Sequence, residues 1–168
     1  MVVVRCTRKL LDRLGQGTPR EVTSTTTLGD WYATVLFTKP QHFVLLVNAA
    51  TRLPVVIPAR GLSTLPIRFA EGLTAVLTAL QIPADIVVAE VREMSDVTFT
   101  TTASRSVLGT MNDDAIYIEA AFHHEDGVAF HTLSVKLADT PVGPLGYDRP
   151  RDVVRQALRK NVETQEMG

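Results

Sequence analysis

The sequence predicts an α+β domain in which a mainly antiparallel sheet packs against four to five helices. Short segments rich in β-branched residues stand between turn-forming residues, and longer segments show the 3.6-residue apolar period of helices. Three of the strand-like segments follow one another closely, which indicates a meander. With 168 residues, 45% of them apolar, the chain can form a single domain with a substantial core.

The N-terminal segment VVVRC, near residues 2–6, is short and β-branched, which predicts a first strand. Thr7 is suited to cap the helix RKLLDRL that follows, because the leucines of this segment share one helical face. Gly15 and Gly17 end the helix. The polar, threonine-rich connection that follows predicts a flexible loop near residues 15–29.

Residues 30–58 form the clearest β region. WYATVLFTK alternates between apolar and polar side chains, as a half-buried strand does, whereas HFVLLVNAA is apolar on both faces, as a covered central strand is. TRLPVVIPA carries Pro54 and Pro58, which cannot donate to a ladder and therefore indicate an edge strand or the end of a strand. Because short turns join the three segments, we expect an antiparallel meander.

The strongest helix is GLSTLPIRFAEGLTAVLTALQI, whose apolar residues follow the helical period and in which Ser63 is a natural N-cap. The next segment, ADIVVAEVREM at residues 84–94, is ambiguous. Its β-branched residues favour a strand, whereas Val87, Val91 and Met94 would line one face of a helix. The sequence leaves both alternatives open.

Three further elements complete the expected fold. VTFTTT predicts a strand near residues 97–102, and the alternation in VAFHTLSVKLAD predicts another near residues 128–138. Pro150 is suited to open a last helix that runs to about Arg159. Residues 161–168 are expected to form a frayed tail.

The charge of the chain is balanced, with 17 basic and 18 acidic residues and a net charge of −1. A protein that binds nucleic acid by neutralising phosphates needs a basic surplus or stripe, so nucleic acid is not an expected partner. No apolar stretch is long enough for a signal peptide or a membrane span. A cytoplasmic location without membrane contact is therefore expected.

The single cysteine, Cys6, cannot form an internal disulfide and is expected to be a buried, inert thiol. Without a cysteine cluster there is no structural zinc motif, and neither a metal nor another cofactor is expected. His123 and His124 precede Glu125 and Asp126, residue types that bind metals. Adjacent side chains on a helix point about 100° apart, however, so a solvated helix end is the preferred interpretation.

SRSVLGTMNDDA, residues 104–115, is the stretch that looks most like a site. Continued as a helix into AIYIEAAFHH, it places apolar side chains in one stripe, formed by Val107, Met111, Ala115, Ile118 and Phe122. Arg105, Asn112 and Glu119 are spaced by seven and lie along one flank of this stripe. The preferred interpretation is helix capping together with one structural salt bridge.

The functional interpretation of this stretch is anion binding by Arg105. Ser104 or Ser106 would lie beside it, and the helix N-terminus would add partial positive charge. Alternatively, Thr110 with Asp113 forms a capping box, in which case the helix begins later and SRSVLG is a loop. The stretch lacks the glycine-rich cradle and the lysine of a nucleotide-binding loop.

Asp30, in the segment LGDWY, precedes the first strand of the meander and can accept hydrogen bonds from nearby donors. If this end of the sheet lies near the helix of residues 104–115, Asp30 would meet Arg105. The candidate binding residues are therefore Asp30, Ser104, Arg105, Asn112, Asp113 and Glu119.

Four segments of the chain, VRCTRKLL, LGDWYATVLF, RSVLGTMND and TPVGPLGY, together resemble an uncharacterised bacterial family, a domain of unknown function. The resemblance extends through nearly the whole chain. It implies a standalone or accessory bacterial domain and brings no established activity. It also implies an apolar or aromatic residue at position 114, where this chain has Asp114.

Two functions are compatible with these features. The first is an interaction or regulatory accessory module that binds a protein partner or forms a homo-oligomer. The alternative is an enzyme, a hydrolase or nuclease acting on a phosphate-containing substrate, with Arg105 as anion binder. A pocket in which Arg105, Asp30, Asn112 and a histidine converge would favour the enzyme, whereas an exposed apolar patch would favour partner binding.

Overall fold

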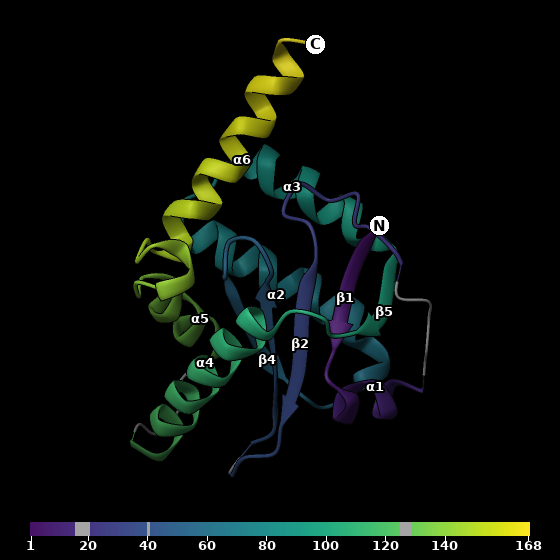
Figure 1. Ribbon diagram of the computed structural model, residues 1–168, viewed down its shortest axis with the longest axis vertical. Coiled ribbons are helices and arrows are strands. Elements are labelled where there is room, and N and C mark those ends of the chain that lie inside the picture. Colours follow the sequence, from purple (N-terminus) through teal and green to yellow (C-terminus); the bar gives the residue numbers. More distant parts are fainter. Residues whose placement is uncertain (16–20, 40, 125–128) are drawn as a thin grey trace.

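The computed structural model describes residues 1–15, 21–39, 41–124 and 129–168 and confirms the α+β class. Five strands form one open, mixed sheet in the order β4-β3-β2-β1-β5 (Figure 1). The strands are β1 (Val2–Cys6), β2 (Trp31–Leu36), β3 (Phe43–Asn48), β4 (Pro54–Pro58) and β5 (Val97–Thr101). The described residues contain six α-helices where four to five were expected: α1 (Arg8–Leu14), α2 (Leu65–Ala79), α3 (Ala84–Arg92), α4 (Arg105–His124), α5 (Phe130–Ala138) and α6 (Pro150–Glu166).

The expected meander is present, because β2 pairs antiparallel with β3 and β3 pairs antiparallel with β4. Strand β1 instead pairs parallel with both β2 and β5. The sheet is therefore mixed rather than mainly antiparallel. Helix α1 explains why β1 and β2 are parallel. A helix between two strands carries the chain back to the end of the sheet at which the first strand began, so the next strand runs in the same direction.

The strand expected near residues 128–138 is wrong, because residues 130–138 form helix α5. The outer two of the three alternating apolar residues, Leu133 and Leu137, are four residues apart, a spacing that also fits a helix, and both are buried on one face. Ser134 is buried between them and accepts a hydrogen bond of 3.0 Å from the backbone amide of Val56 in β4. Helix α5 thus covers the edge strand β4 and accepts a hydrogen bond from one of its amides, on the side where β4 has no neighbouring strand.

The ambiguous segment at residues 84–94 is helical. Helix α3 ends at Arg92, and a 3-10 turn (Glu93–Ser95) follows. Val87 and Met94 are buried, as the helical alternative requires. The last helix begins at Pro150 as predicted but continues to Glu166, beyond the expected end near Arg159. The loop expected near 15–29 lies partly outside the described residues, and its flexibility stays a prediction.

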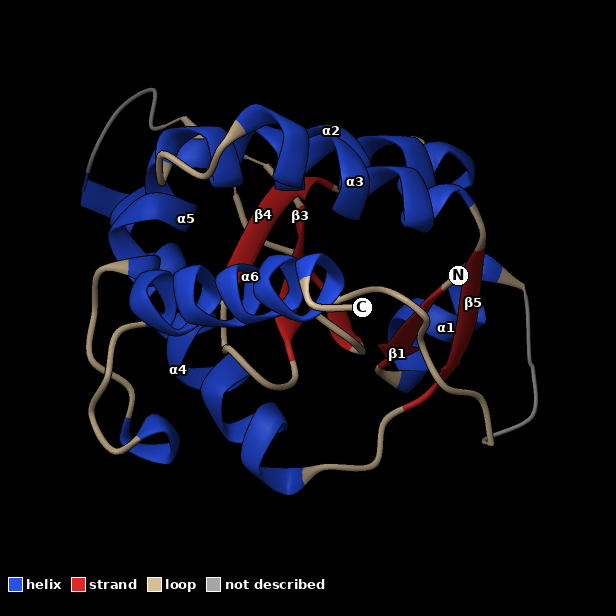
Figure 2. Ribbon diagram, turned by 90° about the horizontal axis from the view of Figure 1, so that it is seen from above, coloured by secondary structure: helices blue, strands red, loops and turns tan. Residues whose placement is uncertain are grey.

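The two faces of the sheet carry separate cores. Helices α2 and α3 lie on one side of the sheet and α4 on the other, as Figure 2 shows. On the α2 side, the rings of Trp31 and Phe69 meet edge to face with centroids 5.0 Å apart. Gly72 lets α2 approach β4 closely, because a Cβ at this position would lie 2.9 Å from Ile57. On the α4 side, aromatic and aliphatic side chains of β2, β3 and β4 meet the apolar stripe of α4.

Candidate functional site

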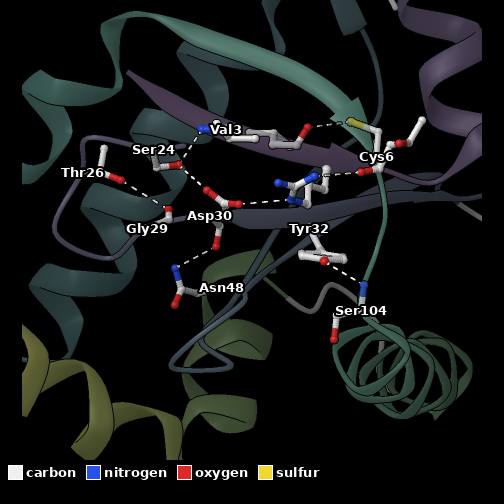
Figure 3. A network of polar contacts seen from close by, with 12 residues as sticks. Val3, Cys6, Ser24, Thr26, Gly29, Asp30, Tyr32, Asn48 and Ser104 are labelled. Carbon is white, nitrogen blue, oxygen red and sulfur yellow. Dashed lines mark hydrogen bonds and ion pairs between the residues drawn. The ribbon is translucent and has the colours of Figure 1, made fainter. Parts of the chain in front are cut away.

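Asp30 lies just before β2 and forms an ion pair with Arg5 of β1. The Nε atom of Arg5 donates to a carboxylate oxygen of Asp30 at 3.1 Å, and the hydroxyl of Ser24 donates to the other oxygen at 2.7 Å (Figure 3). The pair is largely buried, with 15% of the Arg5 side chain and 24% of the Asp30 side chain exposed. Among the described residues no ion pair joins Asp30 to Arg105, so the nearby donor expected for Asp30 is Arg5.

Asn48, fully buried at the end of β3, fixes the turn that leads into β4. Its amide nitrogen donates to the carbonyl oxygen of Leu28 at 2.9 Å, and its oxygen accepts the backbone amides of Ala50 and Thr51 at 3.2 and 2.9 Å. The hydroxyl of Thr51 also donates to this oxygen at 2.9 Å. Because one side chain holds both the loop before β2 and the turn after β3, the backbone between Asn48 and β4 has a well-defined path.

Tyr32 positions the start of α4. Its hydroxyl oxygen accepts the backbone amide of Ser104 at 2.9 Å (Figure 3). The Ser104 hydroxyl in turn accepts the amide of Val107 at 3.3 Å, which is the bond of an N-cap residue. Helix α4 therefore begins at Arg105, and the alternative in which Thr110 caps a later helix is wrong.

Arg52, which is not among the candidate residues from the sequence, lies in the turn between β3 and β4 and reaches the first turns of α4. Its two Nη atoms donate to the hydroxyls of Thr110 at 2.9 Å and Ser106 at 3.1 Å. The residue is only 9% exposed, and its buried Nε atom has no hydrogen-bond partner among the described residues. Burial lowers the pKa of this guanidinium, and the nearby Tyr32 opposes the shift.

The backbone of Arg52 is also unusual, with a φ of 60°. This left-handed conformation is uncommon for a residue that carries a Cβ and persists only where the surrounding structure imposes it. An arginine directly before the apolar run LPVVI is the sequence signal that could have identified it.

The flank predicted along α4 is present but is spread along the helix. The apolar stripe is confirmed, because its first four members are buried and Phe122 packs against them. Arg105, Asn112 and Asp113 are exposed, and Glu119 is partly exposed. Fourteen residues of helix separate Arg105 from Glu119, a rise of about 21 Å, so these side chains do not meet around one pocket.

Asp114 is a partly buried charged group on α4. Its Oδ2 atom is buried and has no hydrogen-bond partner among the described residues. Burial, with a smaller contribution from the neighbouring Asp113, raises the pKa of this carboxyl from 3.8 to about 7. The position is the one at which the family resemblance implies an apolar side chain, and its surroundings in the structure disfavour a charge.

Three hollows on the molecule have distinct chemistry. A cavity of about 410 Å³ at the carboxyl ends of β1 and β5 is lined by Arg5 and residues 101–103. An acidic cleft of about 740 Å³ between α3 and α6 includes the buried Glu90, which accepts the amides of Thr27 and Leu28 at 3.1 and 3.0 Å. A groove of about 570 Å³ between α2 and α3 is lined mostly by apolar side chains.

The other residues singled out in the sequence are dispersed. Cys6 is buried and free, and burial raises the pKa of its thiol to about 12, which agrees with an inert thiol. His123 and His124 are exposed at the end of α4, and their acidic neighbours Glu125 and Asp126 lie outside the described residues. Within the described part of the chain, no group of three or more His, Cys, Asp and Glu side chains is arranged to hold a metal ion, and no helix is long and apolar enough to cross a membrane.

Comparison with known proteins agrees with the resemblance seen in the sequence. No curated protein and no solved structure matches the chain. A family model described as a domain of unknown function, DUF6933, matches residues 3–153, which include β1 except its first residue, strands β2 to β5 and helices α1 to α5. This chain therefore belongs to the DUF6933 family.

Proposed function

We propose that this protein is a cytoplasmic accessory module that binds an amphipathic helix of a partner protein in the groove between α2 and α3. The observation that carries the proposal is the apolar outer surface of these two helices. Six of the nine side chains that line the groove are apolar: Pro66, Ile67, Ala70, Ala75, Val91 and Met94. Ile67 is 64% exposed, and Val88 on the outer side of α3 is 54% exposed. Large apolar side chains exposed to water are typical of an interaction surface where they gather in a patch.

The shape and charge of the groove favour a helix as its occupant. A hollow between two packed helices accepts the side-chain ridge of a third helix, with anchors at helical spacing. Glu71 is the one charged side chain among the lining residues. We therefore expect the partner helix to carry an apolar stripe and a lysine or arginine that faces Glu71.

Two other features support a binding module. The candidate residues Asp30, Arg105 and Asn112 do not converge on a pocket with a histidine among the described residues, which is what the hydrolase alternative requires. The free, buried thiol of Cys6 is typical of a protein in a reducing compartment and supports the proposed cytoplasmic location.

A display library of amphipathic helical peptides, selected on the full-length protein, tests the proposal. We expect selected peptides to share an apolar stripe with a basic residue and to lose at least about tenfold in affinity against Ile67→Asp, since a charge would enter the apolar groove. Glu71→Lys should shift the selection toward acidic peptides.

Ile116→Asp is the matched control, because Ile116 is 67% exposed on α4, away from the groove. Peptides that bind Ile67→Asp as tightly as the wild type would contradict the proposal. If the wild type is a dimer and Ile67→Asp is a monomer, the occupant of the groove is a second copy of this chain and not a partner helix.

A further inference from the structure

The α4 side of the sheet carries a second feature, a buried positive charge without a counter-ion. Arg52 is 9% exposed, and among the described residues its Nη atoms donate hydrogen bonds only to the neutral hydroxyls of Ser106 and Thr110. Among the described residues, its Nε atom has no acceptor and none of their carboxylates forms an ion pair with it. A buried charge is costly unless an opposite charge compensates it, so an anion bound near this guanidinium would lower that cost.

The turn that carries Arg52 is built to hold it in this place. The residue keeps a left-handed backbone, and its own amide donates to the carbonyl oxygen of Asn48 at 3.0 Å. The side chain of Asn48 fixes the two residues before the arginine through three further bonds. The position of the guanidinium beneath α4 is thus imposed by the turn.

The N-terminus of α4 supplies hydrogen-bond donors on the solvent side of the Arg52 guanidinium. The helix has 20 residues, and the positive end of its dipole lies at Arg105. Backbone amides of Arg105 and Ser106 have no acceptor among the described residues, whereas that of Val107 is taken by Ser104. Ser106 is exposed, and its hydroxyl can donate outward while it accepts from Arg52. Arg105 is exposed and has no ionic partner in the described part of the chain.

We propose that these groups form a binding site for a phosphoryl group, carried either by free phosphate or by a small phosphomonoester. The first-turn amides and the Ser106 hydroxyl donate to the phosphoryl oxygens, and Arg105 contacts them from the exposed side. Arg52 supplies the buried counter-charge through Ser106. A phosphoryl group near neutral pH carries up to two negative charges, which match two guanidinium groups and a helix N-terminus.

Isothermal titration calorimetry on the full-length protein, in a buffer free of phosphate and sulfate, tests the site. We expect the wild type to bind inorganic phosphate at one site. Arg52→Met should weaken binding at least about tenfold, because it removes the buried counter-charge. Ser106→Asp should abolish binding, because the new carboxylate takes the place of the phosphoryl group beside Arg52. A parallel titration with glycerol 3-phosphate distinguishes the two sources: equal or tighter binding assigns a phosphomonoester, and binding of inorganic phosphate alone assigns the free ion.

Arg60→Gln is the matched control, since Arg60 is an exposed arginine beyond β4, and its phosphate affinity should stay within about twofold of the wild type. If Arg52→Met fails to fold, as judged by circular dichroism, Ser106→Asp retains the whole core and still tests the site. Absence of saturable binding by the wild type up to about 10 mM phosphate would overturn the proposal. Equal binding by the wild type and Ser106→Asp would overturn it as well.

Discussion

Arg5 and Arg52 are both largely buried on the α4 side of the sheet, yet their partners differ. Arg5 has the carboxylate of Asp30 at 3.1 Å, and that carboxylate is completed by Ser24. Arg52 is more deeply buried, and its acceptors within the described part of the chain are two hydroxyls. The Arg5–Asp30 ion pair stabilises the fold, whereas the Arg52 guanidinium, which has neutral partners, can still attract an anion.

Asp114 is the acidic counterpart of Arg52. Its Oδ2 atom, like the Nε atom of Arg52, is buried and has no hydrogen-bond partner among the described residues, but the two groups differ in how this cost can be removed. The carboxyl can become neutral by taking up a proton near pH 7, whereas an arginine remains charged at any physiological pH. Of the two, Arg52 is therefore the one whose charge requires a ligand.

The largest expected effect is a difference in the free energy of unfolding between substitutions of Arg5 and Arg52. Arg5→Met should lower the free energy of unfolding by about 3 kcal/mol, because it leaves the partly buried Asp30 without its cation. Arg52→Met should change it by less than about 1 kcal/mol, since the hydroxyls it releases can bond to carbonyls of their own helix and a buried charge is removed. Urea denaturation at pH 7 measures both values.

Asp139→Asn is the control for this comparison, because Asp139 pairs with Arg149 and Arg151 at the surface, where 49% of its side chain is exposed. It should cost less than about 1 kcal/mol. Equal losses for Arg5→Met and Arg52→Met would remove the distinction between a compensated and an uncompensated arginine.

A smaller effect is expected at Asp114. Its pKa in the folded protein, about 7, lies above the ordinary value of 3.8, so folding favours the protonated form. The stability of the wild type should therefore be unaffected below about pH 4 and should fall as the pH rises toward 7. Asp114→Asn removes this loss and should raise the free energy of unfolding by about 2 kcal/mol at pH 8, with no gain at pH 4.

Asp113→Asn, at the exposed neighbour, is the control for the pH series and should change stability by less than about 0.5 kcal/mol. A gain for Asp114→Asn that is the same at pH 4 and pH 8 would show that the charge of Asp114 is not its cause.

The sequence predicted the elements whose patterns are local. The alternation in β2, the prolines of β4 and the apolar stripe of α4 each identify their element without reference to the rest of the chain. Helix α5 was missed because Leu133 and Leu137, four residues apart, fit both periods, and the amide of Val56 that Ser134 satisfies lies 78 residues away.

The site was only partly predictable for the same reason. Ser104 and the start of α4 follow from capping preferences, but the partners that give the site its charge depend on tertiary packing. Arg52 lies 54 residues from Ser106, and Asp30 lies 25 residues from Arg5. The parallel register of β1 and β2 places Arg5 beside Tyr32, and no local pattern indicated that register.

The most direct test of an arginine that lacks its anion is a double-mutant cycle between Ser106→Asp and Arg52→Met, measured as free energies of unfolding in phosphate-free buffer. His131→Asp, at the corresponding second position of α5, provides the reference for the general benefit of an acidic residue at a helix start. We expect Ser106→Asp to stabilise the protein only while Arg52 is present, with a coupling energy of about 1–2 kcal/mol. The coupling between His131→Asp and Arg52→Met serves as the reference. A coupling between Ser106→Asp and Arg52→Met that is below about 0.3 kcal/mol, or no larger than this reference, would contradict the claim that Arg52 lacks an anion.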